Sequence, residues 1–336
     1  MSKIKMGVIG FGYWGPNLAR NIHTSASCEL VGLCDMNQKQ LDKAHRLYPN
    51  AKCVTSIDAL LTLDIDAVVI ATPVHTHFPL TKQCLEASKH VLVEKPLTST
   101  VQEAETLIKL AQKKHCILMV DHTFNYTSAI GKLKQLIHDG ELGELLYWDS
   151  VRINLGLFQP DVNVMWDLAP HDLSIMDYVL DKQPKAVKAI GSKHFGQKVE
   201  DIAYLTLLFD SSFIAHFHCN WLSPVKVRQT LIGGSNKMVV YDDIEASEKI
   251  KIYDKGVDVK KTNEGRYETL VQYRTGDMYC PNLKNVEALS VEIEHFADVI
   301  NNNTPAISSG EAGLNVVKIL EAAQRSIEKN GREILL

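Results

Sequence analysis

Short apolar segments alternate with amphipathic segments along the first 120 residues of the chain. The apolar runs are KMGVIG, ELVGLCD, AVVIAT, HVLVEK and CILMVD, and each of them closes on a polar or small residue. Runs this continuous are typical of strands that are buried on both faces, as in a parallel sheet covered by helices. Helical spacing occupies the intervals at 16–23, 38–48, 79–88 and 101–113. The alternation predicts an α/β domain over residues 1–122, built on a doubly wound parallel sheet of the Rossmann type.

The pattern changes after about residue 122. Strands are predicted at 145–152, 185–192, 202–209, 213–221, 227–232, 237–241 and 249–253, with tight turns at 210–212 and 233–236. Short turns of this kind join antiparallel neighbours. A polar, irregular stretch over 254–285 is expected to form a long loop or arm, and helices are predicted at 291–301 and 311–329. Residues 123–336 should therefore form an α+β domain with an open, mostly antiparallel sheet.

Composition and charge narrow the class of protein. A chain of 336 residues exceeds the size at which one hydrophobic core stops growing, about 250–300 residues, so two domains are expected. The formal net charge of −4 provides no broad basic field for nucleic acid or for an acidic membrane surface. The seven cysteines are odd in number and form no CxxC pair, and no apolar stretch approaches 18 residues. We therefore expect a cytoplasmic protein with reduced thiols, no membrane span and no nucleic-acid partner.

A glycine-rich turn follows the first predicted strand. It has the GxGxxG spacing and consists of Gly10, Phe11, Gly12, Tyr13, Trp14 and Gly15. The first glycine permits a tight turn, the second lets the backbone approach a pyrophosphate, and the third lets the following helix lie close to the sheet. Pro16 suits the first position of that helix, whose N–H groups can bind the anion. The pattern predicts a dinucleotide site.

Asp35 closes the next predicted strand, 20 residues after Gly15. A carboxylate at this place can accept hydrogen bonds from the adenosine ribose hydroxyls, and it would repel the additional phosphate of NADP. The three residues after it are neutral, and Lys39 is the first cation to follow. NAD is therefore favoured over NADP as the cofactor. The alternative is a glycine turn that serves packing alone, with Asp35 capping the next helix.

Two further predicted strands end in polar residues, at the edge where a doubly wound sheet binds ligands. The residues predicted to complete the cofactor site there are Thr72, Pro73, His77, Glu94 and Lys95. A lysine near the nicotinamide could hydrogen-bond a substrate hydroxyl and stabilise developing alkoxide charge. Taken alone, Lys95 could equally be a solvated lysine after a strand, and the histidines of these loops, with His122, could be polar loop residues without chemistry.

The segment WDLAPHD, at 166–172, precedes a stretch of helical periodicity. Pro170 predicts that a helix begins near residue 169, which would place His171 in the first turn, where the helix dipole disfavours a charged imidazole. Such a histidine could accept the hydroxyl proton that an alcohol loses with its hydride, and Asp167 could orient it. Helix capping by Asp167 or Asp172 would explain the spacing equally well.

No metal site is predicted. The acids and the histidine of WDLAPHD, and the pair His216 and His218, lack a third and fourth ligand at a telling spacing. Four other residues are conceivable neighbours of a substrate, although ordinary packing is the simpler role for each of them: Tyr126, Arg152, Asn154 and Trp166.

Three segments together resemble the glucose–fructose oxidoreductase/inositol dehydrogenase family. They are ASKHVLVEKPLT at 87–98, WDLAPHD at 166–172 and GEAGLNVVKILEAAQRS at 310–326. The resemblance implies an N-terminal Rossmann domain and a C-terminal open sheet for substrate binding and oligomerisation, in a homodimer or homotetramer. It also implies that Lys95 contacts the reacting hydroxyl, and that Asp167 and His171 handle the proton, with His171 as the base.

Other strings resemble a subgroup of this family that acts at C3 of nucleotide sugars such as UDP-N-acetylglucosamine. They are GFGYWGPNLARN, RINLGLFQPDVNVMWDLAPHD and GDMYCPNL. This resemblance implies an NAD-dependent enzyme that makes or consumes a 3-keto sugar. An inositol or free-aldose dehydrogenase with the same catalytic residues is the alternative. A non-catalytic NAD-binding regulatory protein and a redox-assisted glycoside hydrolase are further alternatives, because a shared fold does not decide between functions.

Overall fold

The chain folds into two compact units, which are described here one at a time. The structure is a computed structural model that describes residues 3–156, 162–196, 198–260 and 270–336, with the side chains of 257–260 and 270–273 also outside the description. The first unit consists of residues 1–127 and 286–321, and the second of residues 128–285 and 322–336. Part of the string RINLGLFQPDVNVMWDLAPHD, residues 157–161, lies outside the described residues.

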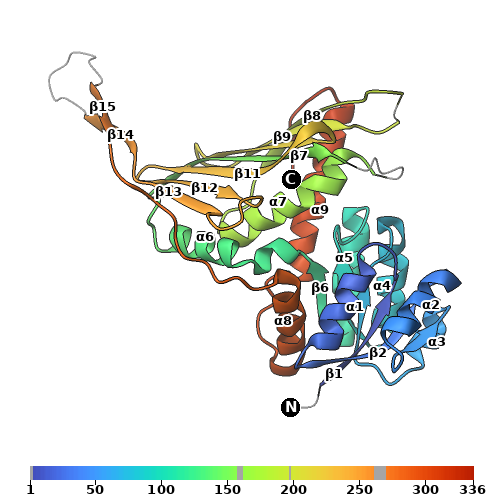
Figure 1. Ribbon diagram of the computed structural model, residues 1–336. Coiled ribbons are helices and arrows are strands. Elements are labelled where there is room, and N and C mark those ends of the chain that lie inside the picture. Colours follow the sequence, from blue (N-terminus) through green and yellow to red (C-terminus); the bar gives the residue numbers. More distant parts are fainter. Residues whose placement is uncertain (1–2, 157–161, 197, 261–269) are drawn as a thin grey trace. The chain divides into compact units, whose positions relative to one another are not determined.

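A six-stranded sheet forms the centre of the first unit (Figure 1). Its strands are β1 (Ile4–Ile9), β2 (Cys28–Cys34), β3 (Lys52–Val54), β4 (Ala67–Ile70), β5 (His90–Glu94) and β6 (Leu118–Asp121). All neighbours are parallel, in the order β3-β2-β1-β4-β5-β6, which confirms the predicted doubly wound sheet. Four strands match predicted runs closely because both of their faces are buried, and all of β4 is buried.

Helices connect the strands of this sheet. They are α1 (Gly15–Thr24), α2 (Gln38–Leu47), α3 (Ile57–Leu61), α4 (His77–Glu86) and α5 (Val101–Lys114), with 3₁₀ turns η1 (Val74–Thr76) and η2 (Thr123–Tyr126). On α1, Leu18, Ala19 and Ile22 are fully buried at helical spacing. β3 and α3 were not predicted, because three and five residues are too short to establish a period.

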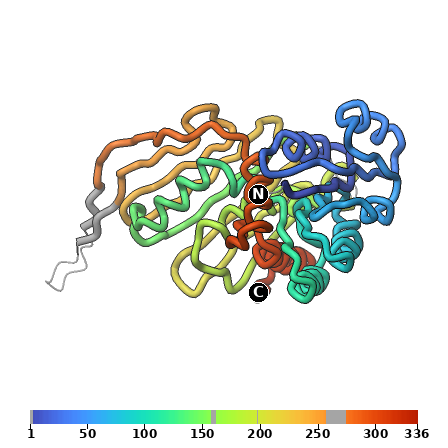
Figure 2. The backbone as a smooth tube through the Cα atoms, turned by 90° about the horizontal axis from the view of Figure 1, so that it is seen from below, coloured from blue at the N-terminus to red at the C-terminus, as the bar shows by residue number. Residues whose placement is uncertain are grey.

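The first unit is completed by a segment from late in the chain, residues 286–321. Its helix α8 (Ala288–Asn302) lies beside α1 and β2, and Figure 2 shows this red-brown segment next to the blue N-terminal strands. The apolar face of α8 buries Leu289, Ile293 and Phe296 in the same core as β1 and β2. The single boundary expected between residues 122 and 123 therefore does not describe the compact units, because α8 needs that core to bury its apolar face.

The second unit contains a nine-stranded sheet. Its order is β16 (Met278–Tyr279), β13 (Ile250–Tyr253), β12 (Met238–Asp242), β11 (Leu222–Gly234), β7 (Leu145–Leu155), β10 (Ile214–Asn220), β9 (Ile202–Leu208), β8 (Ala186–Ser192), β17 (Ile334–Leu335). Only the pair β7 and β10 is parallel among the described pairings, so the mostly antiparallel character is confirmed. The predicted turns at 210–212 and 233–236 join antiparallel neighbours.

Helices α6 (Ser128–His138) and α7 (Val164–Val179) lie along one face of this sheet (Figure 1). The last helix, α9 (Gly310–Glu328), belongs to the first unit as far as Glu321, and its final turns belong to the second. There, the Ser326 hydroxyl accepts a hydrogen bond of 2.8 Å from the Ala189 N–H of β8. Among the described helices, none combines the length and apolarity that a membrane span requires.

The segment predicted as an irregular arm contains a hairpin. β14 (Gly256–Lys260) and β15 (Leu270–Arg274) pair antiparallel, as a two-stranded ribbon that extends away from the nine-stranded sheet in Figure 1. The prediction of irregular structure is therefore wrong for these residues. A ribbon depends on backbone pairing, which a polar composition does not prevent.

Candidate active site

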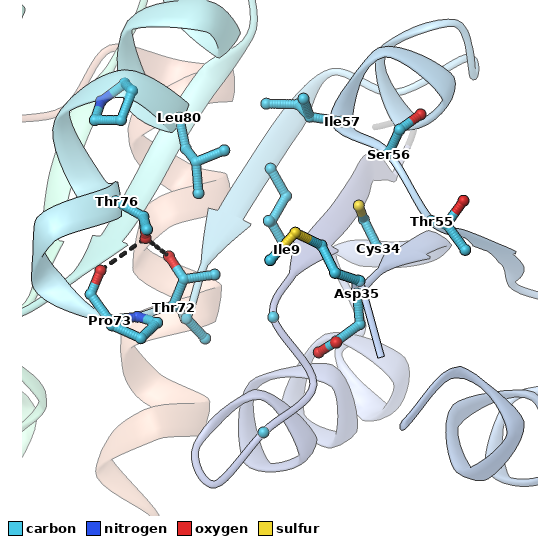
Figure 3. A pocket seen from close by; sticks show the side chains of 15 residues that line it. Ile9, Cys34, Asp35, Thr55, Ser56, Ile57, Thr72, Pro73, Thr76 and Leu80 are labelled. Carbon is cyan, nitrogen blue, oxygen red and sulfur yellow. Dashed lines mark hydrogen bonds between the residues drawn. The ribbon is translucent and has the colours of Figure 1, made fainter. Parts of the chain in front are cut away.

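A cavity of about 540 Å³ opens at the carboxyl ends of β1, β2 and β4 in the first unit. Thr72, Pro73, Thr76 and Leu80 line one side, and Cys34, Asp35, Thr55, Ser56 and Ile57 line the other, with Ile9 between them (Figure 3). The strand order of the sheet reverses between β1 and β4, and this switch point is where doubly wound sheets bind their ligands. The cavity is therefore the candidate cofactor site.

The glycine turn forms the floor of this cavity. Gly10 has a φ of +91°, and a Cβ there would lie 2.5 Å from the carbonyl oxygen of Ala71, so only glycine fits. A Cβ on Gly15 would overlap the carbonyl oxygen of Gly10. Gly12 also lines the cavity, and the position of its missing Cβ is open space. Helix α1 begins at Gly15 without a side-chain cap, so the turn has the form that binds a pyrophosphate.

Asp35 connects the glycine turn to the far side of the cavity. Its Oδ2 accepts a hydrogen bond of 2.7 Å from the Phe11 N–H, and its Oδ1 accepts one of 2.8 Å from the Asn37 N–H. The carboxylate keeps lone pairs for further donors such as ribose hydroxyls. The alternative role of Asp35 as the cap of the next helix is wrong, because Asn37 caps α2 through a 3.0 Å hydrogen bond from the Lys39 N–H.

His77 is placed differently from the other predicted cofactor residues. It is 1% exposed, and its ring nitrogens each lie 2.8 Å from a carbonyl oxygen, Nε2 from that of Thr72 and Nδ1 from that of Pro96. Burial lowers the pKa of His77. The ring therefore joins the loops after β4 and β5, and it does not line the cavity.

The structure divides the other predicted residues of the first unit. Gly10, Gly12, Asp35, Thr72 and Pro73 line the cavity. Three residues of the turn point elsewhere: Phe11 is fully buried, Tyr13 is 90% exposed, and the Trp14 Nε1–H donates a 3.0 Å hydrogen bond to Asp121. Glu94 and Lys95 close β5, and the Lys95–Pro96 peptide is cis.

The sequence did not point to several residues that line the cavity, among them Thr55, Ser56, Ile57, Pro79 and Leu80. Three of them belong to the short connection from β3 to α3, which has no detectable period. The other two lie in a helix that was predicted, but whose orientation toward the sheet the sequence alone does not give. A signal existed only at Ser56, which caps α3 through a 3.2 Å hydrogen bond from the Ala59 N–H.

In the second unit, helix α7 carries Asp167 and His171. It begins at Val164 with Asn163 as its cap, whose side chain accepts a 3.1 Å hydrogen bond from the Trp166 N–H. The predicted start near residue 169 is wrong, and Pro170 lies inside the helix. His171 is therefore seven residues from the helix start, and the argument from the helix dipole does not apply to it. It applies to Asp167, which occupies the first turn, where negative charge is favourable.

Asp167 and His171 are four residues apart in one helix, so their side chains project from the same face of α7. Both are half-buried, while Leu168, Ala169 and Pro170 between them are buried. The Asp167 Oδ2 accepts a 3.1 Å hydrogen bond from the indole N–H of Trp221, which is 1% exposed. This contact fixes the carboxylate beside the histidine.

Asp172, the residue after His171, anchors the helix from its other face. Arg152 of β7 donates two hydrogen bonds of 2.8 Å to the two carboxylate oxygens. The side chains are 2% and 7% exposed, so this is a buried bidentate ion pair. Burial opposes the charge of Arg152, but Asp172 outweighs it and the arginine pKa is raised. Arg152 is thus committed to holding α7.

Two family models match consecutive parts of the chain. "Oxidoreductase family, NAD-binding Rossmann fold" matches residues 4–122, and "GFO/IDH/MocA C-terminal domain" matches residues 130–240. With the cavity and the glycine turn, the first match defines the class of protein, an oxidoreductase with an NAD-binding Rossmann fold. Since both models describe one family, the chain belongs to the glucose–fructose oxidoreductase/inositol dehydrogenase family, GFO/IDH/MocA, as the sequence motifs suggested.

Individual relatives cover nearly the whole chain. UDP-N-acetylglucosamine 3-dehydrogenase of Acidithiobacillus ferrooxidans is 28% identical over 322 residues, which are 94% of this chain and 95% of that protein. A solved structure of that enzyme covers 98% of this chain and 99% of its own, with a TM-score of 0.82 and 25% identity. The scyllo-inositol 2-dehydrogenase (NADP(+)) of Bacillus subtilis is 25% identical over 360 residues, 99% of this chain and 96% of that protein. Sugar and polyol dehydrogenases are thus both among the relatives.

Proposed function

We propose that this protein is an NAD-dependent dehydrogenase or reductase acting at C3 of a nucleotide-linked sugar such as UDP-N-acetylglucosamine. The observation that carries the substrate is the likeness to UDP-N-acetylglucosamine 3-dehydrogenase, which extends over 94% of this chain. Lys95, Asp167 and His171 supply the functional groups that the reaction needs. We further propose that the enzyme works in the cytoplasm as a homodimer or homotetramer, with residues 1–122 as the NAD-binding domain and 123–336 for substrate and assembly.

The preference for NAD over NADP rests on Asp35. Its carboxylate lines the cavity, held by the Phe11 and Asn37 N–H groups, where it can accept hydrogen bonds from the ribose hydroxyls. A phosphate on that ribose would meet this negative charge. Met36 also lines the cavity and is 93% exposed, so it offers no countercharge. The pyrophosphate is assigned to Gly12 and the start of α1.

The chemistry follows from the functional groups of the proposed residues. Bound NAD supplies a nicotinamide ring that takes up a hydride with its electron pair. The Lys95 ammonium hydrogen-bonds the reacting hydroxyl and stabilises negative charge on its oxygen. His171 accepts the hydroxyl proton and passes it to water, and Asp167 orients the imidazole from the same face of α7. The sugar carbon loses a hydride and its oxygen loses a proton, which leaves a ketone.

A polyol dehydrogenase is the second candidate function, favoured by the likeness to scyllo-inositol 2-dehydrogenase over 99% of the chain. It would use the same three residues on a ring without a nucleotide. The test is a panel that contains UDP-N-acetylglucosamine, other nucleotide sugars, myo-inositol, scyllo-inositol and free aldoses, each with NAD and with NADP. NADH formation is followed by its near-ultraviolet absorbance. Turnover of polyols but of no nucleotide sugar would overturn the proposal, and NAD binding without any turnover would favour a regulatory protein.

Lys95→Ala gives the first prediction. Losing a cation that stabilises the developing alkoxide should lower kcat by roughly 10²- to 10³-fold. The Kd for NAD, measured by titration, should change much less, which separates loss of chemistry from loss of cofactor. Lys109→Ala is the matched control, because this lysine is exposed on α5, and it should leave both quantities unchanged. Full activity of Lys95→Ala would remove Lys95 from the mechanism.

A further inference from the structure

Three carboxyl groups meet inside the first unit, next to Lys95. Glu94 closes β5, Asp121 closes β6, and Glu292 belongs to α8. Asp121 is 2% exposed and Glu292 is fully buried. The Asp121 carboxyl lies within hydrogen-bonding distance of the carboxyls of both glutamates. Two carboxylate oxygens can approach in this way only when a proton lies between them.

The available hydrogen-bond donors are concentrated on Asp121. Its Oδ2 accepts the 3.0 Å hydrogen bond from the indole N–H of Trp14, and its Oδ1 accepts one from the Thr123 hydroxyl. By contrast, Oε1 of Glu94 and both oxygens of Glu292 are buried without a conventional donor among the described residues. The donors therefore favour the negative charge on Asp121, with protons on the two glutamates.

The groups around the cluster are consistent with this distribution of protons. Burial, and next the Asp121 charge, raise the pKa values of Glu94 and Glu292 well above their usual range. Burial lowers the pKa of His122 to about 4, so that this ring is neutral. The Tyr126 phenol, also buried, lies 2.8 Å from the Ser308 hydroxyl. Lys95 is the cation that interacts with Glu94.

We propose that Glu94, Asp121 and Glu292 share their protons as one cluster with a single negative charge, and that this charge positions Trp14 of the glycine turn and the adjoining Lys95. The role at Lys95 rests on the proposed function, whereas the proton sharing and the contact with Trp14 do not. Among the residues that the structure describes, no group of three acidic, histidine or cysteine side chains could hold a metal ion, so the cluster is assigned to protons.

The cluster lies behind the cofactor site, on the path from the glycine turn to the end of β5. While it holds its protons, Asp121 fixes Trp14 and the single charge faces the Lys95 ammonium. When the pH rises enough to remove another proton, a second buried negative charge appears near the place proposed for the pyrophosphate. NAD binding should then weaken. The three residues are therefore positioning residues, which act through Trp14 and Lys95.

The first test compares the pH dependence of stability in the wild type and in Glu292→Gln. An unfolded glutamate ionises near pH 4.3, whereas the folded Glu292 keeps its proton to higher pH. Wild-type stability is thus lost as the pH rises through the folded pKa. Glutamine cannot ionise, so the ratio of the folding constants, variant to wild type, should rise about tenfold per pH unit until the folded pKa is reached. Urea unfolding from about pH 5 to 9 measures this ratio.

Glu294→Gln is the matched control on the same helix. Glu294 accepts hydrogen bonds of 2.6 Å from the Ser25 hydroxyl and 3.0 Å from the Ala26 N–H. Burial works against its charge, but these hydrogen bonds prevail and lower its pKa. Its stabilisation is present above the unfolded pKa, so the control variant should lose stability over the range where Glu292→Gln gains it. Parallel pH curves for the wild type and Glu292→Gln would show an ionised Glu292 and overturn the proposal.

The second test measures the Kd for NAD as a function of pH. In the wild type it should rise about tenfold as the cluster loses a further proton, and in Glu292→Gln it should stay nearly constant. Trp14→Phe keeps a ring at this position and removes the N–H donor to Asp121, so it should weaken NAD binding at all pH values. A wild-type Kd that does not change with pH would overturn the positioning role. Both tests read unfolding or binding, so a protein inactive on every sugar would still decide them.

Discussion

Both units bury charge beneath residues proposed for catalysis, and they neutralise it by different means. In the second unit, Arg152 and Asp172 form two hydrogen bonds of 2.8 Å in a site where both side chains are below 10% exposure, directly after His171. In the first unit, Glu94, Asp121 and Glu292 meet beside Lys95, and shared protons take the place of a cation for two of the three.

The difference shows how one chain can hold two catalytic segments under different control. An arginine stays charged over the whole physiological range, so the pair that anchors α7 should not respond to pH. Protons shared among carboxyls can be removed, so the contact between the cluster and the glycine turn should respond. We therefore expect pH to act on the cofactor side of the enzyme and to leave the anchoring of α7 unchanged.

The largest effect is expected from Arg152→Met, which removes the cation from the second unit and leaves Asp172 buried without its partner. The expected loss of unfolding free energy is about 3–5 kcal/mol, measured by urea denaturation. The double variant Arg152→Met with Asp172→Leu should recover much of this loss, because it leaves no unpaired charge. A loss below about 1 kcal/mol in the single variant would mean that the pair does not anchor α7.

His122 gives the next largest effect, at low pH. Burial holds its folded pKa at about 4, whereas an unfolded histidine takes up a proton near pH 6.5. The depressed pKa means that stability is present above pH 6.5 and falls as the pH decreases toward 4, by about 3 kcal/mol in total. His122→Gln should remove this acid loss, while His138→Gln, a variant of an exposed histidine, should keep it. An unchanged acid limb in His122→Gln would contradict the buried neutral ring.

The smallest effects compare two helix caps, one in each unit. Asn163 caps α7 from a buried position and also donates hydrogen bonds of 2.8 Å to Glu200 and Gln324. Asn37 caps α2 in an exposed position. Asn163→Ala should lower the unfolding free energy by about 1–2 kcal/mol, and Asn37→Ala by about 0.5–1 kcal/mol. Equal losses in the two variants would show that burial adds nothing to the cap of α7.

The sequence predicted the first unit better than the second, and two prolines show why. The same rule places Pro16 and Pro170 at helix starts. Pro16 is indeed at the start of α1, where a glycine turn and a buried strand precede it. Pro170 lies inside α7, because Asn163 and the first turn after it form a stronger start signal, and packing offsets the hydrogen bond that proline removes.

Long-range contacts were beyond the reach of the sequence. The glycine turn and Asp35 lie within one local strand–turn–helix–strand unit, so their spacing carries information about the cofactor site. Glu94, Asp121 and Glu292 come from β5, β6 and a helix about 170 residues further on, and no local pattern relates them. The place of α8 in the first unit was missed for the same reason, since its periodicity shows an apolar face but not the core that receives it.

The most direct test of the proposed reaction follows the transferred hydrogen. UDP-N-acetylglucosamine deuterated at C3 would be incubated with the enzyme and NAD, and the reduced cofactor would be analysed by mass spectrometry. The account predicts that each reduced cofactor gains one deuterium and that the sugar becomes a 3-keto product. Reduced cofactor without deuterium, formed while the sugar is oxidised, would contradict hydride transfer from C3 and place the reaction at another carbon.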